Sequence, residues 1–272
     1  MKKGLILILV LLLTVSLLGA CGPKTEAPKD TGGSEAEAGD KATMLLAAAA
    51  SLEASFRDEL IPMFVKDNPN ITVDGTYDSS GKLQTQIEEG MEASVFMSAA
   101  VKQMNALVDQ GKIERENVVE LLENQLVLIT GVNSNTKVTG FDNVTEAATI
   151  AIGDPANVPV GQYSEQVFTH LGNWDDVKAK ASLGTNVTEV LNQVGEGSAE
   201  VGVVYATDAA QIPDKVKVIT AAPEGSLNKV IYPVAILKDA PQKAAAEKFI
   251  EFLKSKEAIA VFEKNGFKSN LP

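Results

Sequence analysis

The chain has 272 residues, of which 24 are basic and 36 acidic, giving a formal net charge of −12. A chain this acidic is a poor candidate for binding nucleic acid or anionic lipid through a basic patch. A small anion held by backbone dipoles is still compatible with that charge.

The first 20 residues are typical of a signal peptide. Lys2 and Lys3 precede an apolar run from Leu5 to Leu18, which is short for a membrane span. Small residues then lead to Cys21, the only cysteine in the chain. This ending resembles a bacterial lipobox, in which the cysteine becomes the lipidated first residue; the alternative is an ordinary signal peptide with an incidental cysteine. We expect residues 1–20 to be removed and Cys21 to anchor the protein to the outer face of the cell membrane.

Residues 21–41 are predicted to form a flexible tether. They are rich in Pro, Gly, Glu, Ala, Lys and Thr and contain almost no large apolar side chain, so they cannot bury enough surface to fold. About 230 residues follow, which is enough for one large domain or for two lobes with a substantial core.

Strand patterns and helix patterns alternate along the rest of the chain. The predicted strands are Thr43 to Ala47, Ile71 to Tyr77, Ser94 to Ser98, Gln125 to Thr130, Thr149 to Gly153, Ala181 to Gly184, Val201 to Tyr205, Val216 to Thr220 and Val230 to Leu237. Helical spacing lies between them, as in Phe56, Leu60 and Phe64, where Pro62 should split or kink the helix. The alternation predicts an α/β fold with largely parallel sheets.

Two apolar strands, Gln125 to Thr130 and Val230 to Leu237, have no short hairpin partner nearby. Two strands that cross between lobes would explain both. The predicted lobes are residues 42–123 with 228–272, and residues 124–227. A single doubly wound sheet is the alternative.

The stretch from Ala47 to Ala50 leads from a strand into Ser51, where a helix should begin. Small side chains let the backbone approach a ligand closely, and a helix start presents unpaired N–H groups. Ser51 therefore is either one wall of an anion site or an N-cap that serves only its own helix.

Four further positions have a similar character. Ser80, within Ser79 to Gly81, and Val160, within Pro159 to Gly161, lie at predicted helix starts, where each segment taken alone could equally serve only its own helix. Val187 begins another helix. Tyr205 ends an apolar strand and offers an uncharged hydroxyl donor, although it could equally be a core aromatic residue.

Several motifs together resemble the periplasmic molybdate-binding protein family of bacterial molybdate ABC transporters. In order along the chain they are Ala48 to Leu52, Ser79 to Gly81, Gln103 to Leu107, Gly153 to Pro155 with Val158 to Tyr163, Val203 to Ala209, and Ile231 to Ala235. The resemblance extends from about Met44 to Phe267, and the combination of motifs is specific whereas single pieces would be weak.

The resemblance implies a lipoprotein of the two-lobed type II periplasmic-binding-protein fold, a monomer without cofactor or cation ligands. It would capture molybdate or tungstate by lobe closure and deliver the oxyanion to an ABC permease and ATPase. The residues in the positions of the family's oxyanion ligands are the side chains of Ser51, Ser80 and Tyr205 and the backbone amides of Val160 and Val187. Ser94 and Ala100 depart from aspartates found in many relatives, which puts local packing or closure in doubt rather than anion chemistry.

A site of N–H and O–H donors selects a ligand that only accepts hydrogen bonds. Molybdate and tungstate are fully deprotonated at neutral pH, whereas phosphate keeps a proton that would lack an acceptor. That mismatch costs about 1 to 3 kcal/mol or more. Sulfate would have to be excluded by size.

Other functions are less well matched by the sequence. A serine hydrolase would need a catalytic histidine, but His170, the only histidine, precedes Gly172 at a predicted helix end, and no Gly-x-Ser-x-Gly motif occurs. Ferric iron would need clustered oxygen and nitrogen ligands, but the four tyrosines and one histidine are widely scattered. A sugar site would need stacked aromatic side chains, and only 5% of the residues are aromatic. Sulfate is the hardest rival to dismiss.

Overall fold

The computed structural model describes residues 41–272. The predicted signal peptide, Cys21 and all but the last residue of the predicted tether lie outside the described residues. Within the described part, no helix has the length and apolar character needed to cross a membrane.

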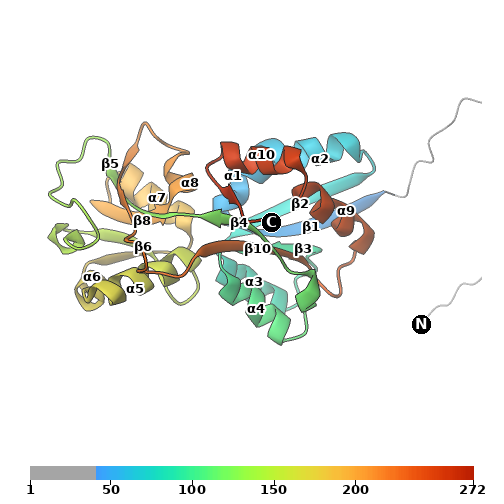
Figure 1. Cartoon of the computed structure of the whole chain (residues 1–272), viewed down its shortest axis with the longest axis horizontal. Coiled ribbons are helices and arrows are strands. Elements are labelled where there is room, and N and C mark those ends of the chain that lie inside the picture. Colours follow the sequence, from blue (N-terminus) through green and yellow to red (C-terminus); the bar gives the residue numbers. More distant parts are fainter. Residues whose placement is uncertain (1–40) are drawn as a thin grey trace, which may run out of the picture. The chain divides into compact units, whose positions relative to one another are not determined.

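The described residues form two β-sheets with helices packed on both sides of each (Figure 1). Sheet A has six strands, in the order β11 (Lys268–Ser269), β4 (Val119–Asn124), β10 (Val230–Ile236), β3 (Val95–Met97), β1 (Ala42–Ala49) and β2 (Ile71–Asp78). Sheet B has five strands, in the order β7 (Ala181–Gly184), β6 (Ile150–Gly153), β8 (Val201–Tyr205), β5 (Leu126–Gly131) and β9 (Val216–Ala221). The predicted two-lobed α/β fold is thereby confirmed.

Both sheets are mixed, and so less parallel than the sequence suggested. β1 runs parallel to β2 and β3, and β6 runs parallel to β7 and β8. β10 is antiparallel to β3 and β4, and β5 is antiparallel to β8 and β9. The physical reason is that β5 and β10 enter their sheets from the other sheet, and therefore run against the strands built by local strand–helix–strand connections.

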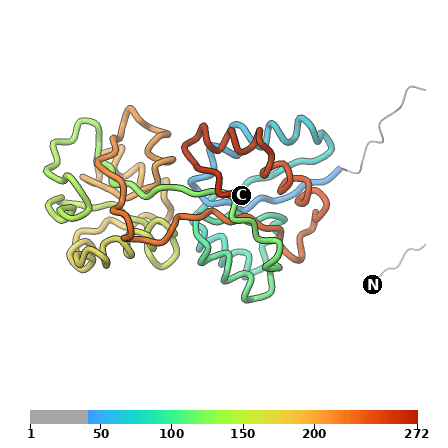
Figure 2. The backbone as a smooth tube through the Cα atoms, viewed as in Figure 1, coloured from blue at the N-terminus to red at the C-terminus, as the bar shows by residue number. Residues whose placement is uncertain are grey.

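The chain crosses between the sheets twice (Figure 2). β4 leads through the single residue Gln125 into β5, and residues 222–229 carry the chain back from β9 to β10. These crossings occur where the sequence predicted them. The lobe bounds stay a prediction.

The segment after β1 changes helix type several times. A 3₁₀ turn, η1 (Ala50–Leu52), is followed by α1 (Glu53–Ser55), a π-helical turn η2 (Phe56–Leu60) and α2 (Ile61–Asp67). Pro62 lies in the first turn of α2 and has no N–H to give. The wider π turn immediately before it confirms the expected interruption at this proline.

Eight further helices complete the described part, and three of them begin at the predicted helix starts near Ser80, Val160 and Val187. They are α3 (Ser80–Glu88), α4 (Val101–Asp109), α5 (Pro159–Leu171), α6 (Trp174–Ala179), α7 (Val187–Gly195), α8 (Ala206–Ala209), α9 (Lys243–Leu253) and α10 (Lys256–Lys264), with 3₁₀ turns η3 (Arg115–Asn117) and η4 (Val144–Glu146). In Figure 1, α2, α9 and α10 cover one side of sheet A and α3 and α4 cover the other.

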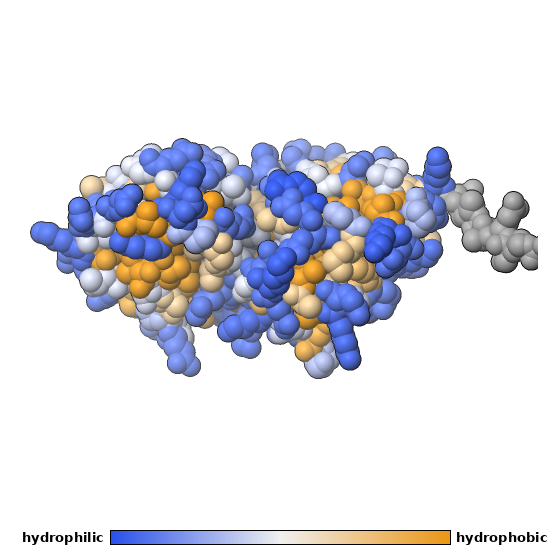
Figure 3. Space-filling model, turned by 90° about the horizontal axis from the view of Figure 1, so that it is seen from above, coloured by the Kyte–Doolittle hydropathy of each residue, from blue (hydrophilic) through white to orange (hydrophobic). Residues whose placement is uncertain are grey.

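Apolar side chains fill the space between helices and sheets. Phe56, Phe64, Phe249 and Phe262 are almost fully buried, and their rings contact one another at 4.9 to 6.1 Å between centroids. The face in Figure 3 is mainly hydrophilic, with apolar side chains in separate patches. This packing provides the rigid support from which the ends of β1, β2 and β8 present their residues.

Candidate functional site

The five residues singled out in the sequence line one small cavity. Ser51, Ser80, Val160, Val187 and Tyr205 all border it, and none is more than 5% exposed. Residues up to 154 positions apart along the chain are therefore brought together by the fold. Their role as ligands stays a prediction.

Both sheets contribute to the cavity wall. Ser51 follows β1 and Ser80 follows β2, both strands of sheet A. Val160, Val187 and Tyr205 lie just after β6, just after β7 and at the end of β8, all in sheet B. The cavity thus lies at the carboxyl ends of parallel strands from two sheets, which is the usual place for a ligand in α/β folds.

The hydroxyl of Ser51 does not cap a helix, so the N-cap alternative is wrong. Ala49 occupies the cap position of η1, and no side-chain cap bond is formed there. The Ser51 Oγ instead lies 2.9 Å from the phenol oxygen of Tyr232. The chain turns into a 3₁₀ helix at Ala50, which places Ser51 inside the turn and aims its hydroxyl into the interior.

The hydroxyls of Ser79 and Ser80 make different hydrogen bonds. Ser79 is the N-cap of α3, and its Oγ accepts from the Lys82 N–H at 3.4 Å. The Ser80 Oγ accepts from the Ala99 N–H at 3.0 Å. Because an N–H can only donate, the proton of Ser80 is available to a ligand.

Two helix starts supply backbone donors. Val160 is the second residue of α5, after Pro159, and Val187 is the first residue of α7. First-turn N–H groups have no acceptor within their own helix and attract negative charge. Asn186 caps α7 by accepting from the Glu189 N–H at 3.0 Å, which leaves the Val187 N–H unused by the cap.

The phenol of Tyr205 is buried and polar but has no hydrogen-bond partner within residues 41–272. Burial raises the pKa of Tyr205, so the phenol keeps its proton at neutral pH. The Tyr205 N–H donates to the Asp208 Oδ2 at 3.1 Å. Burial raises the pKa of that carboxyl to about 7, although the bond from the Tyr205 N–H lowers it.

Small side chains make room for a ligand, as the alanine run suggested. Ala49, Ala50 and Ala99 all border the cavity. One carboxylate, that of Asp78, was not foreseen at this margin. Its Oδ1 accepts from the Ser79 N–H at 2.8 Å and its Oδ2 pairs with the ammonium group of Lys82, which offsets the negative charge of the carboxylate.

Tyr232 contacts the site residue Ser51, although no role was predicted for it. It belongs to one of the motifs quoted above, but its contact with Ser51 joins residues 181 positions apart. Its ring also packs edge-on against Tyr205, with centroids 5.8 Å apart. Only the register of β10 in sheet A reveals this contact.

The positions that depart from the family pattern lie outside the cavity lining. Ser94 is 1% exposed, and its backbone bonds to Leu45 and Leu237. Ala100 occupies the cap position of α4 without a side-chain bond, and the Ser98 Oγ accepts from its N–H at 3.1 Å. The expectation that these departures affect packing or closure rather than anion chemistry stays a prediction.

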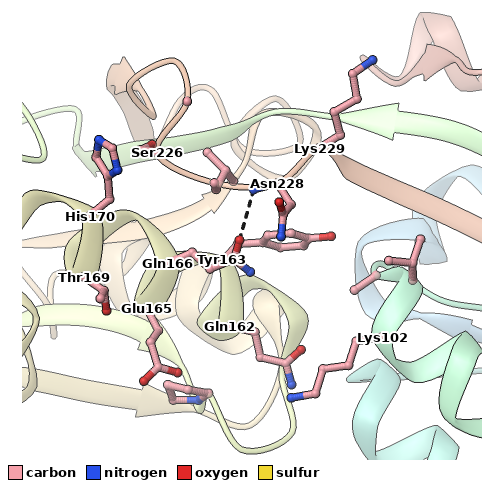
Figure 4. Close-up of a pocket in the computed structure, with 15 residues that line it drawn as sticks. Lys102, Gln162, Tyr163, Glu165, Gln166, Thr169, His170, Ser226, Asn228 and Lys229 are labelled. Atoms are coloured by element: carbon pink, nitrogen blue, oxygen red, sulfur yellow. Dashed lines mark hydrogen bonds between the residues drawn. The ribbon is translucent and has the colours of Figure 1, made fainter.

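A larger cleft lies beside α5 (Figure 4). Gln162, Glu165 and His170 of α5 face it, with Lys102 of α4 on the opposite side and Lys229 near the second crossing. His170 lies in the last turn of α5, as predicted from the following Gly172, whose φ is 75°. It lines this cleft rather than the cavity that contains Ser51, so His170 does not pair with Ser51.

Residues 44–268 match the family described as bacterial extracellular solute-binding protein. The chain belongs to this family. The match places the protein outside the cytoplasm and in a family of binding proteins, in agreement with the predicted resemblance.

Three individual relatives show which members of this family the chain resembles. A Bacillus subtilis protein named as an ABC transporter substrate-binding lipoprotein, YvgL, is 40% identical over 84% of this chain and 86% of its own. The molybdate-binding protein ModA of Haemophilus influenzae is 35% identical over 81% of this chain and 87% of its own. A solved Clostridium difficile structure, named as the substrate-binding domain of a molybdenum ABC transporter, aligns with a TM-score of 0.64 at 34% identity, covering 84% of this chain and 99% of that one.

Proposed function

We propose that this protein captures molybdate, and also tungstate, outside the cytoplasm and delivers it to an ABC permease and ATPase. The observation that carries the proposal is that five residues with a hydroxyl or a helix-start amide line one buried cavity, whose bordering carboxylate is paired with Lys82. Similarity to the molybdate-binding protein of Haemophilus influenzae supports the same ligand.

The direct ligands in this proposal are the hydroxyls of Ser51, Ser80 and Tyr205 and the amides of Val160 and Val187. A tetrahedral dianion without protons accepts from all five groups. The positive ends of α5 and α7 offset its charge without a fixed cation, which suits a protein whose net charge is −12. Monohydrogen phosphate carries a proton that would face hydrogen-bond donors and find no acceptor among the five groups.

The lobes in this proposal are residues 42–123 with 228–272, and residues 124–227. Ligand binding closes them, because each lobe holds only part of the donor set. The small-angle scattering curve of the soluble protein should therefore change on addition of molybdate. Identical curves with and without the anion would contradict closure.

Calorimetric titration of the soluble form, residues 41–272, with molybdate, tungstate, sulfate and phosphate tests the ligand. We expect molybdate and tungstate to bind tightly, sulfate much more weakly and phosphate not at all. Sulfate is the second candidate because it is also an unprotonated tetrahedral dianion. Sulfate affinity equal to molybdate affinity would overturn the specific proposal and leave a general oxyanion binder.

The membrane attachment in this proposal is a lipid on Cys21, and the bound protein acts as a monomer. The lipoprotein name of YvgL supports the anchor. Labelling of cells with a radioactive fatty acid should mark the wild-type protein and not a Cys21→Ser variant. Equal labelling of both would place the lipid elsewhere.

A further inference from the structure

The hydroxyl of Ser51 is the end of a buried chain of hydrogen bonds that starts at the first crossing between the sheets. Asn124, at the end of β4, and Tyr232, in β10, form the chain behind Ser51. Asn124 is 7% exposed, and the other two residues are 2% exposed or less. Water is therefore a poor substitute for any missing partner in the chain.

The backbone fixes the orientation of the Asn124 amide. The Gln125 N–H lies 2.8 Å from the Asn124 Oδ1, and an N–H needs an acceptor. The Asn124 Nδ2 then faces the Thr207 Oγ1 at 2.9 Å and the Tyr232 phenol oxygen at 3.3 Å. Both of its protons are thereby assigned.

This orientation decides the direction of the next bond. The Tyr232 oxygen receives a proton from Asn124, so its own proton must go to another acceptor. The Ser51 Oγ, 2.9 Å away, is that acceptor. The reverse arrangement would give the Tyr232 oxygen two donors and leave its own buried proton without a partner, at an energetic cost.

We infer that Asn124 and Tyr232 are positioning residues that hold Ser51 as a donor toward the cavity. Ser51 accepts from Tyr232, so its own proton is directed at the ligand. The inference rests on the proposed function and deepens it, because it explains how a serine, which could accept as well as donate, rejects a protonated oxyanion. Asn124 also donates to Thr207 in α8, which follows β8 of sheet B. The chain of hydrogen bonds therefore links the Ser51 hydroxyl to both sheets at their first crossing.

A double-mutant cycle separates this role from general structural support. We expect Tyr232→Phe to weaken molybdate binding about tenfold, the size of a bond to a charged ligand. In a Ser51→Ala background the same change should alter the affinity less than about twofold, because no hydroxyl is left to orient. Equal losses in both backgrounds, or no loss in either, would overturn the inference.

A second cycle uses Asn124→Asp with Ser51→Ala. An aspartate keeps the size of Asn124 but removes its donors, so Tyr232 turns its proton toward residue 124 and no longer toward Ser51. The added charge repels the ligand in both backgrounds and cancels in the cycle. A coupling free energy near zero between Asn124→Asp and Ser51→Ala would also refute the inference. This second cycle keeps the inference testable if Tyr232→Phe folds poorly.

Tyr77→Phe is the matched control, since the phenol oxygen of Tyr77 is buried without a hydrogen-bond partner within residues 41–272. It should leave the affinity unchanged in both backgrounds. Melting temperatures without ligand show whether each variant is folded. Failure of the wild-type protein to bind molybdate would instead remove the proposed function, an outcome distinct from binding with additive losses.

Discussion

The Gly81 N–H donates a 3.0 Å hydrogen bond to the Asn157 carbonyl oxygen, joining the first turn of α3 to the loop that precedes α5. A β-carbon at Gly81 would lie 2.2 Å from that oxygen. Only glycine therefore allows this approach between the two halves of the cavity wall.

Gly81→Ala should weaken molybdate binding at least about tenfold, because the added methyl group keeps the α3 start away from the α5 start. Gly131→Ala is the control, since its β-carbon would meet nothing closer than 3.7 Å. Calorimetry on both variants measures the difference. Wild-type affinity in Gly81→Ala would show that this approach is not needed for binding.

Tyr205→Phe should lower the molybdate affinity without lowering the stability of the ligand-free protein. The variant removes a buried phenol oxygen that has no partner in the described part of the chain, so unfolding of the ligand-free protein should need the same free energy or about 1 kcal/mol more. It also removes one proposed ligand, so molybdate affinity should fall about tenfold or more. Denaturant unfolding and calorimetry measure the two effects, and a loss of stability without ligand would contradict the assignment of a free donor.

Asp208 should make stability depend on pH. Burial raises the pKa of this carboxyl to about 7, from 3.8, so the folded state holds a proton that the unfolded chain releases between these values. Its contribution to stability is full below about pH 4 and is lost as the pH rises through 7. Each unit of pKa shift corresponds to about 1.4 kcal/mol.

The Asp208→Asn variant isolates that contribution. Its free energy of unfolding, minus that of the wild type, should increase by a few kcal/mol between pH 4 and pH 7 and then level off. Asparagine keeps an oxygen that can accept from the Tyr205 N–H. A constant difference across this range would show that Asp208 titrates normally.

Asn186→Ala should destabilise the protein by about 1 kcal/mol through loss of the α7 cap. Molybdate affinity should fall with it, because the helix start that carries Val187 loses its order. Ser255→Ala is the control: it removes the cap of α10, where the Ser255 Oγ accepts from the Ala258 N–H at 3.2 Å, and Ser255 does not line the cavity. The control should cost similar stability with unchanged affinity, and equal affinities in both variants would argue against the Val187 amide as a ligand.

Local patterns were sufficient to predict most strands and the starts of α3, α5 and α7. The strands missed were β4 and β11. β4 contains Glu120 and Glu123 among its apolar residues and owes its form to pairing with β10 and β11. β11 has only two residues, too few for any periodicity. Both are strands that tertiary pairing defines and sequence alone does not.

The convergence of the five site residues followed from the carboxyl ends of the predicted strands together with the family resemblance. The bond between Ser51 and Tyr232 could not be predicted in the same way. It depends on the register of β10, which shifts between Tyr232 and Pro233 against β4. A one-residue change in register would turn Tyr232 to the other face of the sheet.

The division of the five donors between two sheets has a consequence for unloading. Two of the proposed ligands move with sheet A and three with sheet B, so any force that spreads the sheets removes part of the set from the anion at once. Neither half alone can replace the water that a dianion loses on entry. A transporter that grips both lobes could thus empty a tight site by mechanical separation, without any competing ligand and without a change in protonation.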